Sequence, residues 1–412
     1  MNPCKISIIG DFWDCQIYRN RLYLWCTNGK LAVVDWIQLV EFFIEDEYDR
    51  LAFTCAFLQG GLLYGDGLQV LFNDEAFKAL LYSKFSRINS RELVIDELAL
   101  RAFMLGEQDN PFRELQTDSE ILNNKIYAAT YKGILSATAH RNLTNNYKVS
   151  TKAPLVNDFI AFNMKAGRYA KIALSGGNEG LYEYRASSYY HSIFDWEDEE
   201  PGNMDDADMK KISGRHSSFA DYNFSSIYNS SLLGDSFLSY HKWAEQEDYI
   251  PGKKKLIFEE EISQEAIFGR SEVNSLSWGT NEKLYYAADN VLEVVTFDSR
   301  ENASEMFSQK KLFNFQPWKG RIIKGGTSYF GTIVECENAL VVLTGNDNFF
   351  NIPGEITRWR VYPRSINYEN HLHVIQNDRL EIYSFNDDYF KDQQEKDFGI
   401  MFQEKYFKFG RK

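Results

Sequence analysis

Residues 282–298 read EKLYYAADNVLEVVTFD, and this stretch has the pattern of a β-hairpin. Residues 284–286 are apolar or aromatic and suit a first strand, residues 288–290 contain Asp and Asn and suit a turn, and residues 292–297 suit a returning strand. Asn, Asp and Gly favour the backbone conformations of tight hairpin turns, whereas β-branched and aromatic residues favour strands. The stretch therefore predicts two antiparallel strands joined by a short turn.

The same pattern recurs along the chain as a short strand, a turn of Gly, Asn or Asp, and a strand of alternating apolar residues. Residues 370–386, NHLHVIQNDRLEIYSFN, and 20–36, NRLYLWCTNGKLAVVDW, repeat it near the two ends. Units spaced by roughly 40 to 60 residues are typical of propeller blades. Eight stretches fit, of which 226–243 fits least well: 20–36, 61–72, 124–139, 169–186, 226–243, 282–298, 338–363 and 370–386.

A further short strand is expected before several hairpins, as in VNSLSW at 273–278 and RSINY at 364–368. One such strand, the hairpin and an outer strand would make a four-stranded blade. We therefore predict that the chain is all-β and forms one domain, 1–412, a single closed β-propeller of seven or eight four-stranded blades. The segment KISII at 5–9 precedes the first hairpin, and we expect it to complete the last blade, because an unpaired edge strand would invite aggregation.

The returning strands share a sequence character, as in LAVVDW, LEVVTF and LEIYSF. With these repeats, the chain resembles the WD40-like class of β-propellers over nearly its whole length. That class carries a Gly-His pair early in each repeat and a Trp-Asp pair at the end of the third strand. Here the Gly-His pair is absent, and the nearest counterpart of the second pair is reversed, Asp35-Trp36. The resemblance is to a divergent propeller, and it implies a rigid platform that binds other proteins.

Some segments between the hairpins depart from the β pattern. Apolar residues at helical spacing in 36–49 predict an amphipathic helix, and Asn73-Asp74 provides N-cap chemistry for a helix over 73–85. Residues 91–105 suit further helix. We therefore predict a helical insert at 73–117 after the second blade, which serves as a partner contact or as a brace for one.

Charge predicts the kind of partner. The net charge is −14 and the pI is near 5.1, which disfavours direct nucleic-acid binding because a phosphate backbone needs a basic face. The acidic run DWEDEEPGNMDDADMKK at 195–211 is expected to be a mobile loop, and it suits a protein partner with a basic surface. Residues 387–412 begin polar, end aromatic and are expected to form a C-terminal tail. Whether the insert or the acidic loop makes the contact stays open.

The sequence also predicts the cellular compartment of the protein. No run of about 18 apolar residues occurs, so no membrane-spanning helix is expected. The start, MNPCKISIIGDFWD, is too acidic and too short in its apolar part for a secretory signal. The cysteines are odd in number and lack a C-x-x-C pair, which indicates free thiols and a cytoplasmic location: Cys4, Cys15, Cys26, Cys55 and Cys336.

Three groups of residues are candidate sites of chemistry. His371 and His373 are two apart on a predicted strand and would share a face, but no third metal ligand is identifiable, so a structural role is favoured. The segment Asp11-Phe12-Trp13-Asp14 holds two carboxylates that could act as acid and base, or could be turn residues beside a buried Trp, which is favoured. The pairs Gly60-Gly61, Gly176-Gly177 and Gly325-Gly326 are interpreted as tight turns at positive φ.

No catalytic, cofactor-binding or metal-binding residue is therefore assigned, and no sequence feature supports an enzymatic function. The function predicted from the sequence is a non-catalytic scaffold for protein–protein interaction, or a subunit of a multiprotein complex. The alternative is a hydrolase, or a sensor of a small ligand or peptide, that uses the central channel of the propeller.

Overall fold

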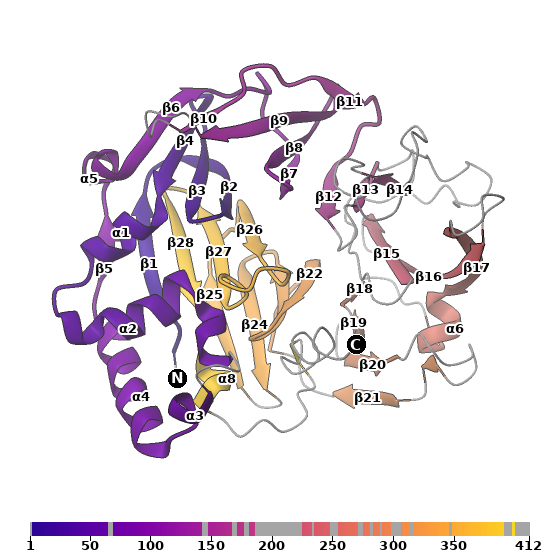
Figure 1. Cartoon of the computed structure of the whole chain (residues 1–412). Helices are drawn as coiled ribbons and strands as arrows, with labels where there is room; N and C mark the ends of the chain where they lie inside the picture. Colours follow the sequence, from indigo (N-terminus) through magenta and orange to yellow (C-terminus); the bar gives the residue numbers. More distant parts are fainter. Residues whose placement is uncertain are drawn as a thin grey trace.

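The structure is a computed structural model. It describes residues 2–64, 69–141, 147–166, 171–176, 181–185, 225–232, 235–247, 254–270, 275–280, 283–288, 291–297, 306–307, 309–313, 317–345, 348–390 and 398–399. This described part is mostly β, and its strands fall into seven sheets (Figure 1). Within it, no helix has the length and apolar character needed to cross a membrane.

The two strands predicted within 282–298 form and pair as expected, whereas the predicted turn residues Asp289 and Asn290 lie outside the described residues. The strands are β19 (Lys283–Ala288) and β20 (Val291–Thr296), which pair antiparallel with Tyr285 opposite Val294. VNSLSW contributes β18 (Leu276–Gly279) on one side, and β21 (Gln309–Phe313) completes a four-stranded sheet on the other. The Trp278 and Tyr285 rings stack across β18 and β19 with their centroids 5.4 Å apart, so the aromatic residues of the sequence pattern become the core of the sheet.

Four other sheets repeat this arrangement of sequential antiparallel strands. One holds β22 (Ile322–Ser328), β23 (Gly331–Cys336), β24 (Ala339–Gly345) and β25 (Asn348–Pro353). Two have three strands each, β12 (Asn163–Ala166), β13 (Lys171–Ser175) and β14 (Leu181–Arg185), and β15 (Ser225–Leu232), β16 (Asp235–Glu247) and β17 (Lys254–Ser263). The fourth has β7 (Asp118–Leu122), β8 (Lys125–Thr130), β9 (Gly133–Arg141) and β10 (Tyr147–Val149), with β11 (Leu155–Asn157) also paired to β9.

The last sheet combines the N-terminal strand with the last hairpin of the chain. It orders β26 (Arg358–Val361), β27 (His371–Gln376), β28 (Arg379–Ser384) and β1 (Cys4–Ile9). β1 runs antiparallel to β28, with Ile6 opposite Ile382, so the prediction that residues 5–9 join the last hairpin is confirmed. β5 (Leu93–Ile95) adds a fifth strand, parallel to β1. The prediction of a strand at RSINY is wrong, because this segment contains turns and bends. The strand before the hairpin is β26.

Helices interrupt the first sheet. This sheet contains β2 (Phe12–Tyr18), β3 (Arg21–Cys26), β4 (Lys30–Asp35) and β6 (Met104–Asp109), and the chain between β4 and β6 is largely helical. The predicted position of the insert, after a second blade, is therefore wrong. The helices are α1 (Trp36–Phe42), η1 (Glu47–Asp49), α2 (Arg50–Phe53), the π-helix η2 (Thr54–Leu58), η3 (Gly60–Tyr64), α3 (Gln69–Phe72), α4 (Glu75–Asn89), α5 (Glu97–Leu100) and η5 (Arg101–Phe103).

The prediction of a hairpin at 61–72 is also wrong, because this stretch belongs to the helical segment. The described residues of this stretch, 61–64 and 69–72, lie in η3 and α3, although LQVLF alternates like a returning strand. Short apolar runs suit strand and helix alike, and here packing decides, because Leu63 and Phe72 enter a helical core. The expected helix start at Asn73-Asp74 is confirmed: Asp74 caps α4 by accepting a hydrogen bond from Phe77 N at 2.9 Å.

The helical segment packs on the last sheet, which contains β1 and β28. Phe53, Phe57 and Phe85 share one buried core with Ile6 of β1 and Ile382 of β28. Figure 1 shows α1, α2 and α4 beside β1 and β5. The short helix α8 (Asp387–Phe390) returns to this region, where the Tyr389 hydroxyl donates to the carbonyl of Phe72.

The sheets are arranged as in a propeller. In each sheet, the strand at one edge, called here the first strand, is β2, β7, β12, β15, β18, β22 or β26. Contacts join β26 to β2, β2 to β7, β7 to β12, β15 to β18 and β18 to β22. Trp359 of β26 donates to Glu335 of β23 at 2.6 Å, which links the last two sheets. Consecutive antiparallel sheets with neighbouring first strands make the fold propeller-type.

Two predictions fall wholly or partly outside this description. The acidic run 195–211 lies outside the described residues. Of the predicted tail, 387–412, only α8 and residues 398–399 are described, and Phe398 packs beside Phe313 and Trp318. The division into these segments stays a prediction.

Candidate functional site

His371 and His373 occupy β27, and both side chains are buried. His371 Nε2 lies 3.0 Å from the carbonyl oxygen of Ala56 and donates to it, because a carbonyl can only accept. His373 Nδ1 lies 3.2 Å from the Tyr362 hydroxyl and 3.7 Å from Cys15 Sγ. Burial lowers the pKa of His371 to about 4 and lowers the pKa of His373 as well. Within the described part, no three His, Cys, Asp or Glu side chains gather closely enough to hold a metal ion.

The contact between Cys15 and His373 does not make an activated nucleophile. Burial, and after it the neighbouring charge of Asp14, raises the pKa of Cys15 to about 12. The thiol is therefore neutral near pH 7, whereas nucleophilic cysteines react as thiolates. The pair packs β2 against β27.

The two carboxylates of the Asp11–Asp14 segment separate in the fold. Asp11 is exposed before β2, whereas Asp14 is inside β2 and fully buried. The interpretation as turn residues is wrong for Asp14, because the alternation of FWDCQIY places Asp14 and Gln16 on one face of a strand. Trp13 is half-buried, and its Nε1 donates to the carbonyl of Gln116 at 2.6 Å.

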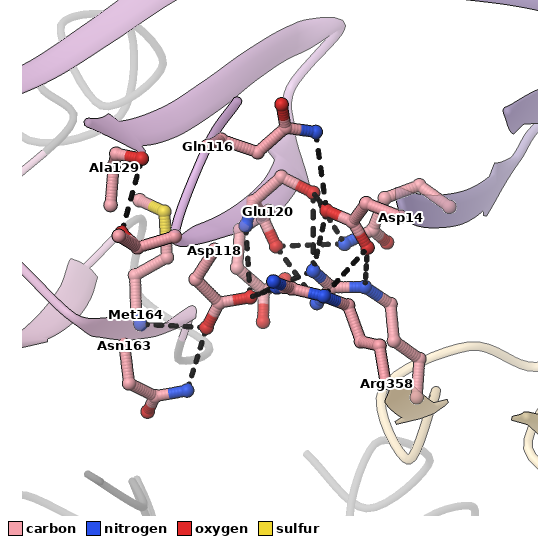
Figure 2. Close-up of polar contacts among 12 residues, drawn as sticks. Asp14, Gln116, Asp118, Glu120, Ala129, Asn163, Met164 and Arg358 are labelled. Atoms are coloured by element: carbon pink, nitrogen blue, oxygen red, sulfur yellow. Dashed lines mark hydrogen bonds and ion pairs between the residues drawn. The ribbon is translucent and has the colours of Figure 1, made fainter. Parts of the chain in front are cut away.

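Asp14 belongs to a buried network of charges between first strands (Figure 2). Arg360 of β26 donates from Nε to Asp14 Oδ1 at 2.7 Å and from Nη2 to Asp14 Oδ2 at 2.8 Å. The same Nη2 donates to Asp118 Oδ1 of β7 at 2.7 Å, and Nη1 donates to the carbonyl of Ser119 at 3.0 Å. One guanidinium thus joins three sheets.

Asp118 extends the network to β12. Its Oδ2 accepts from Asn163 Nδ2 at 2.6 Å and from the backbone nitrogen of Met164 at 2.9 Å, contacts that are visible in Figure 2. Burial alone would raise the pKa of Asp118, but Arg360, Arg358 and then Lys324 lower it to about 2. The carboxylate is therefore ionised at neutral pH and does not serve as a general acid.

Further charged side chains surround this core. Glu120 of β7 lies 3.3 Å from Arg364 and 3.8 Å from Lys165 of β12. Lys324 of β22 lies with its Nζ 4.7 Å from the centre of the Trp359 ring. We define the inner charge cluster as the acidic and basic side chains gathered here: Asp14, Asp118, Glu120, Glu335, Lys165, Lys324, Arg358, Arg360 and Arg364.

Two glycines of β22 make room beside this cluster. A Cβ on Gly325 would lie 2.3 Å from the Trp278 ring, and one on Gly326 would lie 2.6 Å from the Trp359 ring. Both glycines are in the interior of an extended strand, so their interpretation as a turn is wrong. Gly60 and Gly61 are in the 3-10 helix η3, where a Cβ on Gly60 would meet the side chain of Asn370.

Sequence reasoning missed the cluster, although a signal was present. The segment RWRV at 358–361 and the segment DSE at 118–120 each carry two like charges two residues apart. That spacing puts both charges on one face of a strand, and the two pairs have opposite signs. Which strands become neighbours depends on the order of the sheets, and the sequence pattern does not contain it.

Comparison with known proteins gives likenesses of fold only. No family model matches the chain, and no curated protein matches it either. Among solved structures, Kluyveromyces lactis Hsv2 is 12% identical, with 68% of this chain and 80% of that chain covered and a TM-score of 0.39. BamB from Moraxella catarrhalis is 9% identical, with 92% and 82% covered and a TM-score of 0.38. The computationally designed Ika8 protein is 7% identical, with 93% and 100% covered and a TM-score of 0.44.

Proposed function

We propose that this protein is a non-catalytic scaffold for protein–protein interaction, built on a closed propeller of seven blades in the cytoplasm. The seven sheets of the described residues and the antiparallel pairing of β1 with β28 support the count and the closure. Closure further requires the sheet of β12 to meet the sheet of β15. A ring whose sheets are joined by buried ion pairs would hold a binding surface rigidly.

The observation that carries the scaffold function is the surface of the helical segment. Val70 is 93% exposed, Tyr48 is 83% exposed and Leu98 is 77% exposed. Single exposed apolar residues are ordinary, but their concentration on one appended segment is typical of a protein contact. Nine of the seventeen large apolar side chains exposed in the described part lie between 42 and 98: Phe42, Tyr48, Leu51, Val70, Leu71, Leu80, Tyr82, Val94 and Leu98.

We further propose that the partner is a protein with a basic surface and that nucleic acid is not bound directly. The net charge of −14 supports both statements, since it attracts a basic surface and repels a phosphate backbone. Much of this charge comes from the run at 195–211.

Affinity capture with quantitative mass spectrometry tests the scaffold. The single variants Val70→Glu and Leu98→Glu place a charge in the contact, and Leu312→Glu is the matched control, because Leu312 is 52% exposed on β21. We expect a defined set of proteins to be depleted by the first two changes and retained by the third. Equal capture by all variants would rule out the helical segment as the contact.

A second candidate function is the binding of a small ligand at the first strands. The observation that favours it is the inner charge cluster, in which several cations of neighbouring sheets converge.

A further inference from the structure

The inner charge cluster contains more basic than acidic groups. Its basic members are Lys165, Lys324, Arg358, Arg360 and Arg364, and its acidic members are Asp14, Asp118, Glu120 and Glu335. Burial raises the pKa of Glu335, whose carboxylate accepts a hydrogen bond from Trp359 Nε1 at 2.6 Å. The side chains of Lys165 and Arg364 are 33% and 34% exposed, so solvent offsets part of this excess positive charge, and an added anion would neutralise the rest.

Lys324 is the least compensated of these cations. Among the described residues it forms no hydrogen bond and no ion pair, and its Nζ faces the Trp359 ring at 4.7 Å. Burial lowers the pKa of Lys324, while Asp118 and Glu335 act in the opposite direction. Lys324 is nevertheless of intermediate exposure, so the residue keeps partial contact with solvent.

The hydrogen-bonding capacity of the Arg358 guanidinium is also only partly used. Its side chain makes one hydrogen bond in the described structure, a long one of 3.3 Å from Nη1 to Asp118 Oδ1. Its Nε is buried without a hydrogen bond and lies 3.8 Å from Asp14 Oδ1. Arg360 already occupies both carboxylates with shorter bonds, so Arg358 retains donors for another acceptor.

Lys165 adds a third cation from a third sheet. Its ion pair with Glu120 is 3.8 Å long, beyond hydrogen-bond distance, and Glu120 is shared with Arg364. The side chain of Lys165 is 33% exposed. Burial lowers the pKa of Lys165, so its charge too would gain from an added anion.

We propose that Lys324, Arg358 and Lys165 bind a small oxyanion, the carboxylate or phosphate group of a small molecule, between the first strands β22, β26 and β12. An Arg fork and Lys ammonium groups are the side chains that recognise such groups. Arg360 has a positioning role, because it neutralises Asp14 and Asp118, which would otherwise repel the ligand. The proposal does not depend on the scaffold function; it rests on the second candidate function, ligand binding at the first strands, and names the chemistry of that ligand.

Titration of the full chain with inorganic phosphate and with acetate, at constant ionic strength set with chloride, tests this site. Calorimetry and the shift in melting temperature are the readouts. We expect saturable binding of one or both probes, and the preferred probe distinguishes a phosphate ligand from a carboxylate ligand. The variants Lys324→Met and Lys165→Met should each weaken binding by about tenfold or more, since a charge-assisted contact is lost.

Lys30→Met is the control, because Lys30 is on β4 and pairs with the exposed Asp109 at 2.6 Å. It should bind the probes as the unaltered chain does. Two results would overturn the proposal: no saturable response to either probe, or equal loss in Lys30→Met and Lys324→Met. Either result leaves the scaffold untouched, since that function is tested on the helical segment.

Discussion

Arg360 and Asp14 are 346 positions apart and form a two-bond contact, with Nε–Oδ1 at 2.7 Å and Nη2–Oδ2 at 2.8 Å. The Asp14 side chain is fully buried and that of Arg360 is 9% exposed, so the pair has lost most of its hydration and depends on this geometry. It joins the first strand of the last sheet to the first strand of the first sheet.

Removing one partner of this pair should destabilise the protein strongly. We expect Arg360→Met to lower the free energy of unfolding by about 3–5 kcal/mol, because the buried Asp14 would lose both bonds to this guanidinium and the buried Asp118 would lose its shortest contact with a cation. Arg379→Met is the control, since Arg379 pairs with exposed Asp378 at the surface and should change stability by about 0.5 kcal/mol or less. Urea denaturation measures both. Similar losses in the two variants would contradict the role given to Arg360.

The N-terminal strand should be needed for a stable ring. Ile6 and Ile8 of β1 are fully buried, and β1 covers the edge of β28. Deleting residues 1–9 should sharply lower the melting temperature and promote aggregation, because an open edge strand results. Lys5→Ala, which removes the partly exposed ion pair with Glu381 and a contact with the Tyr383 ring but keeps β1, should melt almost as the unaltered chain does. Unchanged cooperative melting after the deletion would show that β1 is dispensable.

The sequence predicted most hairpins because their signal is local. Alternating apolar residues around a turn of Asn, Asp or Gly, as in 282–298, 370–386 and 20–36, depend on neighbours along the chain. The prediction of a hairpin at 61–72 was wrong because a short apolar run does not distinguish a strand from a helix. The inner charge cluster could not be predicted, because it joins β26, β2, β7, β12 and β22 through the order of the sheets.

The glycines of β22 illustrate the same limit. Glycine pairs are ordinarily read as turns, but Gly325 and Gly326 lie where the Trp278 and Trp359 rings press on the strand backbone. We expect Gly325→Ala to lower the free energy of unfolding by about 1–3 kcal/mol through overpacking, as measured by thermal and urea denaturation.

Gly345→Ala is its control, because a Cβ there would be at ordinary contact distances of 3.7–3.8 Å from Asn348. That variant should stay close to the unaltered protein in stability. If Gly325→Ala is no less stable than Gly345→Ala, close packing of Trp278 is not the reason for glycine at 325.

His371 should make stability depend on pH. Its folded-state pKa is about 4, below the value of about 6.5 expected in the unfolded chain. The unfolded state therefore binds more protons between these values, so stability is complete above about pH 6.5 and falls as pH decreases toward 4. The loss amounts to about 3 kcal/mol at 1.36 kcal/mol per pKa unit, and the lowered pKa of His373 acts in the same direction.

The variant His371→Gln isolates this effect, because the amide keeps a donor for the Ala56 carbonyl but does not titrate. We expect this variant to lose less stability between pH 7 and pH 4 than the unaltered protein, measured as the free energy of unfolding in urea at each pH. An identical pH dependence in His371→Gln and the unaltered chain would mean that His371 does not resist protonation in the folded state.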